Sequence, residues 1–77
     1  MQTHISIKLF ATLSKHTPAS ADNYPVAPGT EIRILLEQLG VPENDVKLIF
    51  IDGRKGDLTS KLQGGERVGI FPPVGGG

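Results

Sequence analysis

The chain has 77 residues, 38% of them hydrophobic, which allows a single domain with a modest core and no deep enclosed active site. Eight basic residues balance eight acidic ones, so no net field favours nucleic acid or a membrane surface as a partner. The lack of cysteine excludes disulfides, thiolate metal sites and a cysteine nucleophile. No signal peptide or membrane-spanning apolar run is visible, so we expect a cytoplasmic protein.

The first third of the chain predicts two strands. Residues 5–9 alternate between apolar and polar side chains, which is the period of a half-buried strand. Residues 11–21 are polar and predict a loop. Residues 23–27 predict a second strand, and its place is at a sheet edge because Pro25 cannot donate a ladder hydrogen bond.

The middle of the chain carries the clearest helical pattern. Apolar residues recur with spacings of three and four from residue 32 to residue 39, as Ile32, Leu35, Leu36 and Leu39. Thr30 is a suitable N-cap, and Gly40 is a suitable C-terminal stop. The pattern predicts one helix with one apolar face.

The rest of the chain predicts further strands. Residues 46–51 are apolar on both faces, which predicts a strand at the centre of the sheet, ended by a turn at Asp52-Gly53. Residues 57–62 predict a short irregular element, and residues 67–71 a final strand. This order predicts an α+β fold in which a mixed sheet packs against one main helix, as in the β-grasp, or ubiquitin-like, fold.

The final strand is followed by the sequence Pro72-Pro73-Val74-Gly75-Gly76-Gly77. Phe71 precedes a proline and favours extended geometry, and the two prolines stiffen the segment. Fully extended, the residues after Phe71 could reach roughly 20 Å, and glycines without Cβ could thread a carboxylate into a narrow active site. We therefore divide the chain into a domain, residues 1–71, and an extended flexible tail, residues 72–77. The alternative is a frayed chain end without function.

The sequence resembles the MoaD-like proteins, the small subunits of molybdopterin synthase. The resemblance rests on residues 65–77 and 7–13, and length and element order extend it to essentially the whole chain. ThiS, the sulfur carrier for thiamin thiazole, belongs to a sister family that the last four residues suit equally well. Phe71-Pro72-Pro73 favours the MoaD side, whereas MoaD-like proteins frequently have Ala or Ser where Gly75 stands.

The resemblance implies a sulfur relay in which the chain is a carrier and not an enzyme. An adenylating enzyme of the MoeB/ThiF type would use ATP to activate the Gly77 carboxylate, and a sulfur donor protein would convert it to a thiocarboxylate. In the MoaD case, the tail enters a MoaE-like large subunit and gives its sulfur to a pterin precursor of the molybdenum or tungsten cofactor. The implied roles are attachment at Gly77, threading by Gly75 and Gly76, and partner contact by Phe71, Pro72, Pro73 and Val74. The chain itself would bind no cofactor and no metal.

Three alternatives remain open at this stage. The same chemistry could serve thiamin thiazole or another metabolite, Gly77 could be joined to lysines as in a ubiquitin-like protein modifier, or the tail could be inert on a plain interaction domain. Basic residues could also form a patch near the tail that suits an acidic groove on the activating enzyme, although solvated surface charge is the commoner explanation. The residues of this predicted patch are Arg54, Lys55, Lys61 and Arg67.

Overall fold

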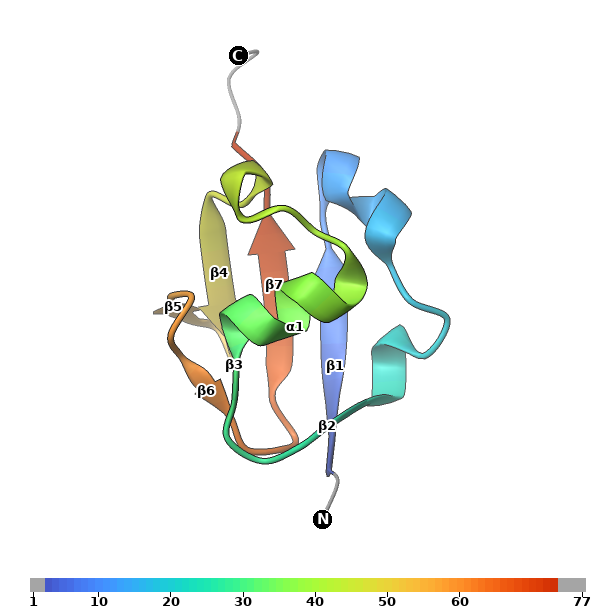
Figure 1. Cartoon of the computed structure of the whole chain (residues 1–77), viewed down its shortest axis with the longest axis vertical. Helices are drawn as coiled ribbons and strands as arrows, with labels where there is room; N and C mark the ends of the chain where they lie inside the picture. Colours follow the sequence, from blue (N-terminus) through green and yellow to red (C-terminus); the bar gives the residue numbers. More distant parts are fainter. Residues whose placement is uncertain (1–2, 74–77) are drawn as a thin grey trace.

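The computed structural model describes residues 3–73, which form a five-stranded mixed sheet with one α-helix across one face (Figure 1). The strands of this sheet are β1 (Thr3–Leu9), β2 (Tyr24–Val26), β4 (Leu48–Ile51), β5 (Arg54–Gly56) and β7 (Arg67–Phe71). The helix is α1 (Ile32–Leu39), and β3 (Thr30–Glu31) pairs with β6 (Lys61–Leu62) in a small second sheet. The connections contain the 3₁₀ helices η1 (Ala11–His16), η2 (Ala21–Asn23) and η3 (Glu43–Asp45). The predicted α+β, β-grasp fold is confirmed.

The strand that leads to the C-terminus lies in the middle of the sheet. The strand order is β2-β1-β7-β4-β5, with β7 parallel to β1 and antiparallel to β4. The prediction that residues 46–51 form the central strand was wrong. In β4, Ile49 is buried towards the helix, and Phe50 on the other face belongs to an aromatic cluster, so an apolar residue on each face did not require a central position.

The edge position predicted for the second strand is confirmed. β2 pairs only with β1 and ends the strand order, and Pro25 lies opposite His4 in the register. A proline is tolerated there because an edge strand has one side without ladder bonds.

The hydrophobic core fills the space between α1 and the sheet. Its members come from alternate strand positions, from one face of the helix and from two connections: Ile5, Ile7, Leu9, Leu13, Val26, Ile32, Leu35, Leu36, Val41, Ile49, Leu62, Val68 and Ile70. Fully burying such a side chain stabilises the fold by about 1.5–3 kcal/mol before entropy costs. Leu13 corrects the prediction of a plain loop over residues 11–21, because that segment contains η1 and the first residue of η2 and buries this leucine.

The start of α1 is capped by backbone and not by the predicted side chain. The N-cap residue is Glu31, which makes no side-chain cap bond, and the first two helical amides donate to the carbonyls of Ser60 and Leu58. The Thr30 hydroxyl donates instead to the carbonyl of Ala27, at 2.6 Å. Backbone carbonyls of the turn before β6 therefore accept the hydrogen bonds of the first helical amides. In many helices, a capping side chain accepts them instead.

Candidate functional site

The last two residues of β7 accept hydrogen bonds from residues that adjoin the neighbouring strands β4 and β1. The amide of Lys47 donates to the carbonyl of Phe71 at 2.8 Å, and the amide of Phe10 donates to the carbonyl of Ile70 at 3.1 Å. Pro72 has no N–H and cannot extend either ladder. The regular pairing of β7 therefore stops where the predicted tail begins.

The structure locates three of the predicted tail and partner-contact residues. Phe71 is half-buried on the face of the sheet opposite the helix, Pro72 is buried and Pro73 is exposed. Ile70, the residue before Phe71, is fully buried on the helix side. Val74, Gly75, Gly76 and Gly77 lie outside the described residues, so their roles stay predictions.

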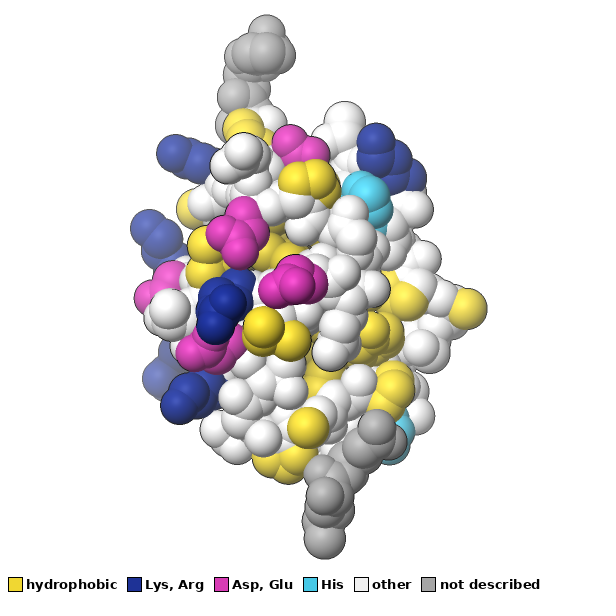
Figure 2. Space-filling model, viewed as in Figure 1, with side chains coloured by type: hydrophobic (Ala, Val, Ile, Leu, Met, Phe, Trp, Pro, Cys, Tyr) yellow, Lys and Arg dark blue, Asp and Glu magenta, His cyan; other side chains and the backbone are white. Residues whose placement is uncertain are grey.

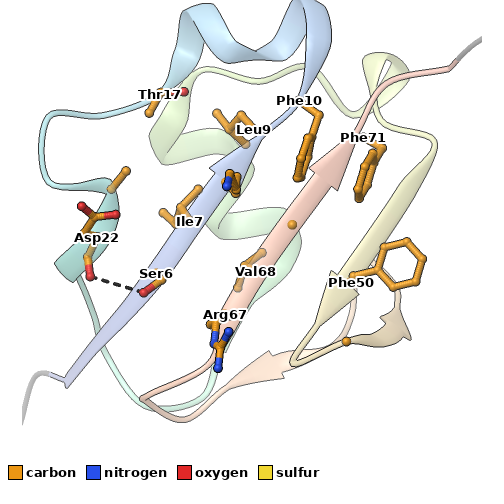
Figure 3. A pocket seen from close by; sticks show the side chains of 14 residues that line it. Ser6, Ile7, Leu9, Phe10, Thr17, Asp22, Phe50, Arg67, Val68 and Phe71 are labelled. Carbon is orange, nitrogen blue, oxygen red and sulfur yellow. Dashed lines mark hydrogen bonds between the residues drawn. The ribbon is translucent and has the colours of Figure 1, made fainter.

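Phe71 belongs to an aromatic cluster on the outer face of the sheet, shown in Figure 3. The ring of Phe10 stacks on that of Phe71 with centroids 4.1 Å apart, and Phe50 lies nearly perpendicular to Phe71 at 5.6 Å. Aromatic pairs of this kind contribute about 0.5–1.5 kcal/mol beyond the burial of their area. We call these three residues the Phe cluster.

A recess of about 560 Å³ lies beside the Phe cluster on the same face. The strand register puts Lys8 and Phe50 on either side of Gly69, which has no side chain. A Cβ added at Gly69 would lie 3.5 Å from the ring of Phe10 and 3.7 Å from that of Phe71. Gly69 is therefore the floor of the recess, and ring edges form part of its wall (Figure 3).

The basic residues predicted as a patch do not gather at the start of the tail. Arg54 and Lys55 lie in the edge strand β5, Lys61 lies in the second sheet, and Arg67 begins the strand whose other end leads to the tail. Figure 2 shows Lys and Arg side chains mostly spread down the left side of the molecule, with others at the upper right and in the middle, rather than collected at one end. Instead, the recess is lined by Arg67 together with Lys8, a residue that the sequence analysis did not single out.

The electrostatics of the described residues are simple. Hydrogen bonds from the Thr59 hydroxyl and amide lower the pKa of Asp57, which does not line the recess. Between residues 3 and 73, no polar side chain is buried, and no group of three His, Asp or Glu residues could hold a metal ion. In the same range, no helix is long and apolar enough to cross a membrane.

Sequence reasoning missed Lys8, Phe10, Phe50 and Gly69 as site residues. A usable signal was present, because strand alternation puts each of them on the face opposite its buried neighbour. What alternation could not show is that three strands would bring these residues together, since that depends on which strands are neighbours.

Comparisons with known proteins agree with the fold. A family model described as Mut7-C ubiquitin matches residues 2–75. Among solved structures, the Haloferax volcanii HVO 2177 protein is 20% identical with a TM-score of 0.74, over 99% of this chain and 88% of that one. A comparison with curated protein sequences found no match.

Two other solved structures are similar to this chain. A putative molybdopterin converting factor, subunit 1, from Pyrococcus furiosus is 25% identical with a TM-score of 0.64, over 94% of this chain and 99% of that one. The small archaeal modifier protein 1 of H. volcanii is 19% identical with a TM-score of 0.67, over the same shares of the two chains. The predicted resemblance to small MoaD-like and ThiS-like ubiquitin-fold proteins is thereby confirmed.

Proposed function

The chain belongs to the Mut7-C ubiquitin family, and we propose that it is a sulfur carrier whose reactive group is the carboxylate of Gly77. The observation that carries the proposal is the place of β7. This strand lies in the middle of the sheet and runs directly into the Pro-Pro-Val-Gly-Gly-Gly sequence. A domain of this kind gives a partner protein a surface to bind, while the terminal glycines enter the active site of that partner.

The proposed chemistry has three steps. A MoeB/ThiF-type enzyme first joins the Gly77 carboxylate to the AMP part of ATP and releases pyrophosphate. The outer sulfur of a persulfide on a donor protein then attacks the acyl carbon, and AMP leaves with the pair of electrons from the broken C–O bond. A thiol finally reduces the S–S bond, so that a thiocarboxylate remains on Gly77.

The thiocarboxylate then serves molybdopterin formation. In this proposal the tail enters a MoaE-like large subunit and transfers its sulfur to a pterin precursor of the molybdenum or tungsten cofactor. Gly75 and Gly76 thread the channel, while Phe71, Pro72, Pro73 and Val74 contact the partner. The chain acts as substrate and subunit and ATP belongs to the activating enzyme, so no step draws on a catalytic side chain or a cofactor of the carrier. Supply of sulfur to thiamin thiazole or another metabolite uses the same carrier steps with a different acceptor.

A second candidate is a ubiquitin-like protein modifier. The similarity to small archaeal modifier protein 1 over 94% of this chain supports this second candidate. Adenylation of Gly77 is common to both candidates. They differ in the nucleophile, because a modifier would form an isopeptide bond with a lysine amine on another protein.

Pyrophosphate exchange tests the shared first step. A purified MoeB/ThiF-type enzyme is incubated with ATP, labelled pyrophosphate and either the whole chain or a chain lacking Gly76-Gly77. We expect label to enter ATP only with the whole chain. No exchange with an enzyme that activates its own carrier in a parallel reaction would overturn both candidates and leave an interaction domain with an inert tail.

A further inference from the structure

The second half of β1 has no strand partner on the side that faces away from β7. β2 pairs with β1 only over residues 3–5 of β1. If this ladder continued, Asp22 would lie opposite Ile7, but Asp22 belongs to η2. The carbonyl of Asp22 accepts a hydrogen bond from the Ser6 hydroxyl at 3.3 Å and none from the Ile7 amide. One edge of β1 is therefore open beyond the end of β2.

The open edge carries backbone groups without a partner in the described part of the chain. The amides of Ser6 and Phe10 donate to the carbonyls of Glu66 and Ile70, on the β7 side. Because backbone groups alternate in direction along a strand, those of Ile7 and Leu9 point to the other side. Among residues 3–73, the amides and carbonyls of these two residues make no hydrogen bond there. The edge thus offers donors and acceptors at the spacing of a β-strand.

The open edge borders a cavity. Ile7 and Leu9 are 5% and 6% exposed, yet both line the recess. The recess extends past β1 to the connection between β1 and β2, where Thr17, Ala21 and Asp22 form its far wall. Figure 3 shows Thr17 and Asp22 on the side of β1 that lies away from β7. We call the space between this stretch of β1 and the wall the edge slot.

We propose that the edge slot receives an extended segment of a protein partner, which adds to β1 as one further strand. The amides and carbonyls of the segment would bond to the carbonyls and amides of Ile7 and Leu9, and the sheet would continue where β2 stops. An added strand supplies the partners that backbone groups beside a buried core require. The inference does not rest on the proposed function, because this edge faces away from β7 and the tail sequence.

The far wall of the edge slot favours a single strand over a second folded sheet. The connection that contains Thr17, Ala21 and Asp22 runs along the outside of the slot (Figure 3). A second copy of this chain could not bring the edge of its own sheet beside β1 without displacing this connection. The occupant is therefore a terminus or a loop of another protein in extended conformation. Its main chain would provide most of the affinity, as in other cases of strand addition.

Hydrogen exchange of the free chain tests the premise. The amide of Lys8 points to β7, whereas the amides of Ile7 and Leu9 point into the edge slot. We expect the amides of Ile7 and Leu9 to exchange faster than the amide of Lys8, because no backbone acceptor protects them. Equal protection of the three amides would show that the edge is already paired and would overturn the proposal.

Binding is then measured with a short peptide of alternating valine and threonine and with the same peptide N-methylated at every residue. Both peptides have the same side chains, but the methylated one has no amide donors. At about ten times the Kd of the first peptide, exchange at Ile7 and Leu9 should slow roughly tenfold, and exchange at Lys8 should change little. We expect the methylated peptide to cause no slowing.

Two variants test the place of binding. Thr17→Trp adds a large side chain at the far wall, and its matched control is Ala19→Trp, at an exposed residue of the same connection that does not line the recess. Peptide binding should be lost in Thr17→Trp and kept in Ala19→Trp. Thermal unfolding checks that both variants fold, and the comparison of the two peptides decides the matter without any variant.

The edge slot is refuted by any of four results. These are no slowing at Ile7 and Leu9 with the first peptide, shifts in the NMR spectrum centred on another part of the chain, equal binding of the methylated peptide, or equal binding by a folded Thr17→Trp variant. None of these measurements uses an enzyme. Their failure therefore leaves the proposed function standing, and failure of pyrophosphate exchange leaves the edge slot standing.

Discussion

The ring of Phe71 lies flat against the ring of Phe10, with centroids 4.1 Å apart and planes 4° apart. The contact joins the last residue of β7 to the first residue after β1, two strands that pair in parallel. Together with the hydrogen bond from Lys47 to the Phe71 carbonyl, it fixes the point from which the tail sequence starts. A carrier that presents its terminus to another protein benefits from such a fixed origin, because less freedom is lost on binding.

Phe71→Ala should lower the free energy of unfolding by about 2 kcal/mol, since a half-buried ring and two aromatic contacts are lost. Phe71→Leu keeps most of the apolar area and should cost about half as much. Urea unfolding measures both values. Equal stability of the alanine variant and the parent chain would show that the cluster does not hold the end of β7.

Gly64→Ala should destabilise the fold by about 2 kcal/mol or more. Gly64 has a φ of 135°, and an added Cβ would collide with the side chain of Thr3. Gly29→Ala is the control, because Gly29 also has a positive φ, of 91°, but nothing lies within 4 Å of its added Cβ. Thermal and urea unfolding should therefore show that Gly64→Ala is less stable than Gly29→Ala. The reverse order of stability would contradict the packing of Gly64 against Thr3.

Glu66→Ala should cost about 1.5 kcal/mol, because the Glu66 carboxylate accepts hydrogen bonds from the amides of Gln63 and Gly64, both at 2.7 Å. Glu66→Gln keeps one acceptor oxygen and should cost less. Hydrogen exchange at the two amides reports directly on these bonds. Unchanged exchange in the alanine variant would mean that the turn before β7 holds its shape without the carboxylate.

Asp57 gives a pH dependence whose sign follows from its lowered pKa. The Thr59 hydroxyl donates a hydrogen bond to the Asp57 carboxylate, and the Thr59 amide does the same, so the folded state favours the charged form. The stability from Asp57 is therefore complete above its unfolded pKa and is lost as the pH falls through the folded pKa.

The check compares the parent chain with Thr59→Val, which removes the hydroxyl donor. The stability difference between them should be largest near neutral pH and should shrink below about pH 4, as the carboxylate becomes protonated. A difference that grows on acidification would mean that the hydroxyl favours the neutral form of Asp57.

Local patterns were sufficient to predict the helix α1, the strands β1, β2, β4 and β7, and the edge position of β2. The spacing of Ile32, Leu35 and Leu36 predicted the helix, and Pro25 predicted the edge, because each signal depends only on neighbours along the chain. Leu13 was missed because a lone apolar residue in a polar segment has no period.

The neighbours of each strand could not be predicted in the same way. An apolar pair such as Ile49 and Phe50 indicates that both faces of a strand are covered. It does not indicate which elements cover them or which strands lie beside it. The middle position of β7, the capping of α1 by the turn before β6 and the meeting of Phe10 with Phe71 all depend on pairings between distant segments. The recess is assembled from those pairings, so the sequence alone could not predict it. The tail, in contrast, is a continuous motif at the end of the sequence.

The measurement that tests the central claim most directly is the intact mass of the chain after incubation with a MoeB/ThiF-type enzyme, ATP and a persulfide donor. A carrier gains the mass difference between one sulfur and one oxygen, and loses that gain when Gly76-Gly77 is removed. An unchanged mass after proven adenylation, or an isopeptide bond from Gly77 to a lysine in place of the sulfur, would contradict the carrier role.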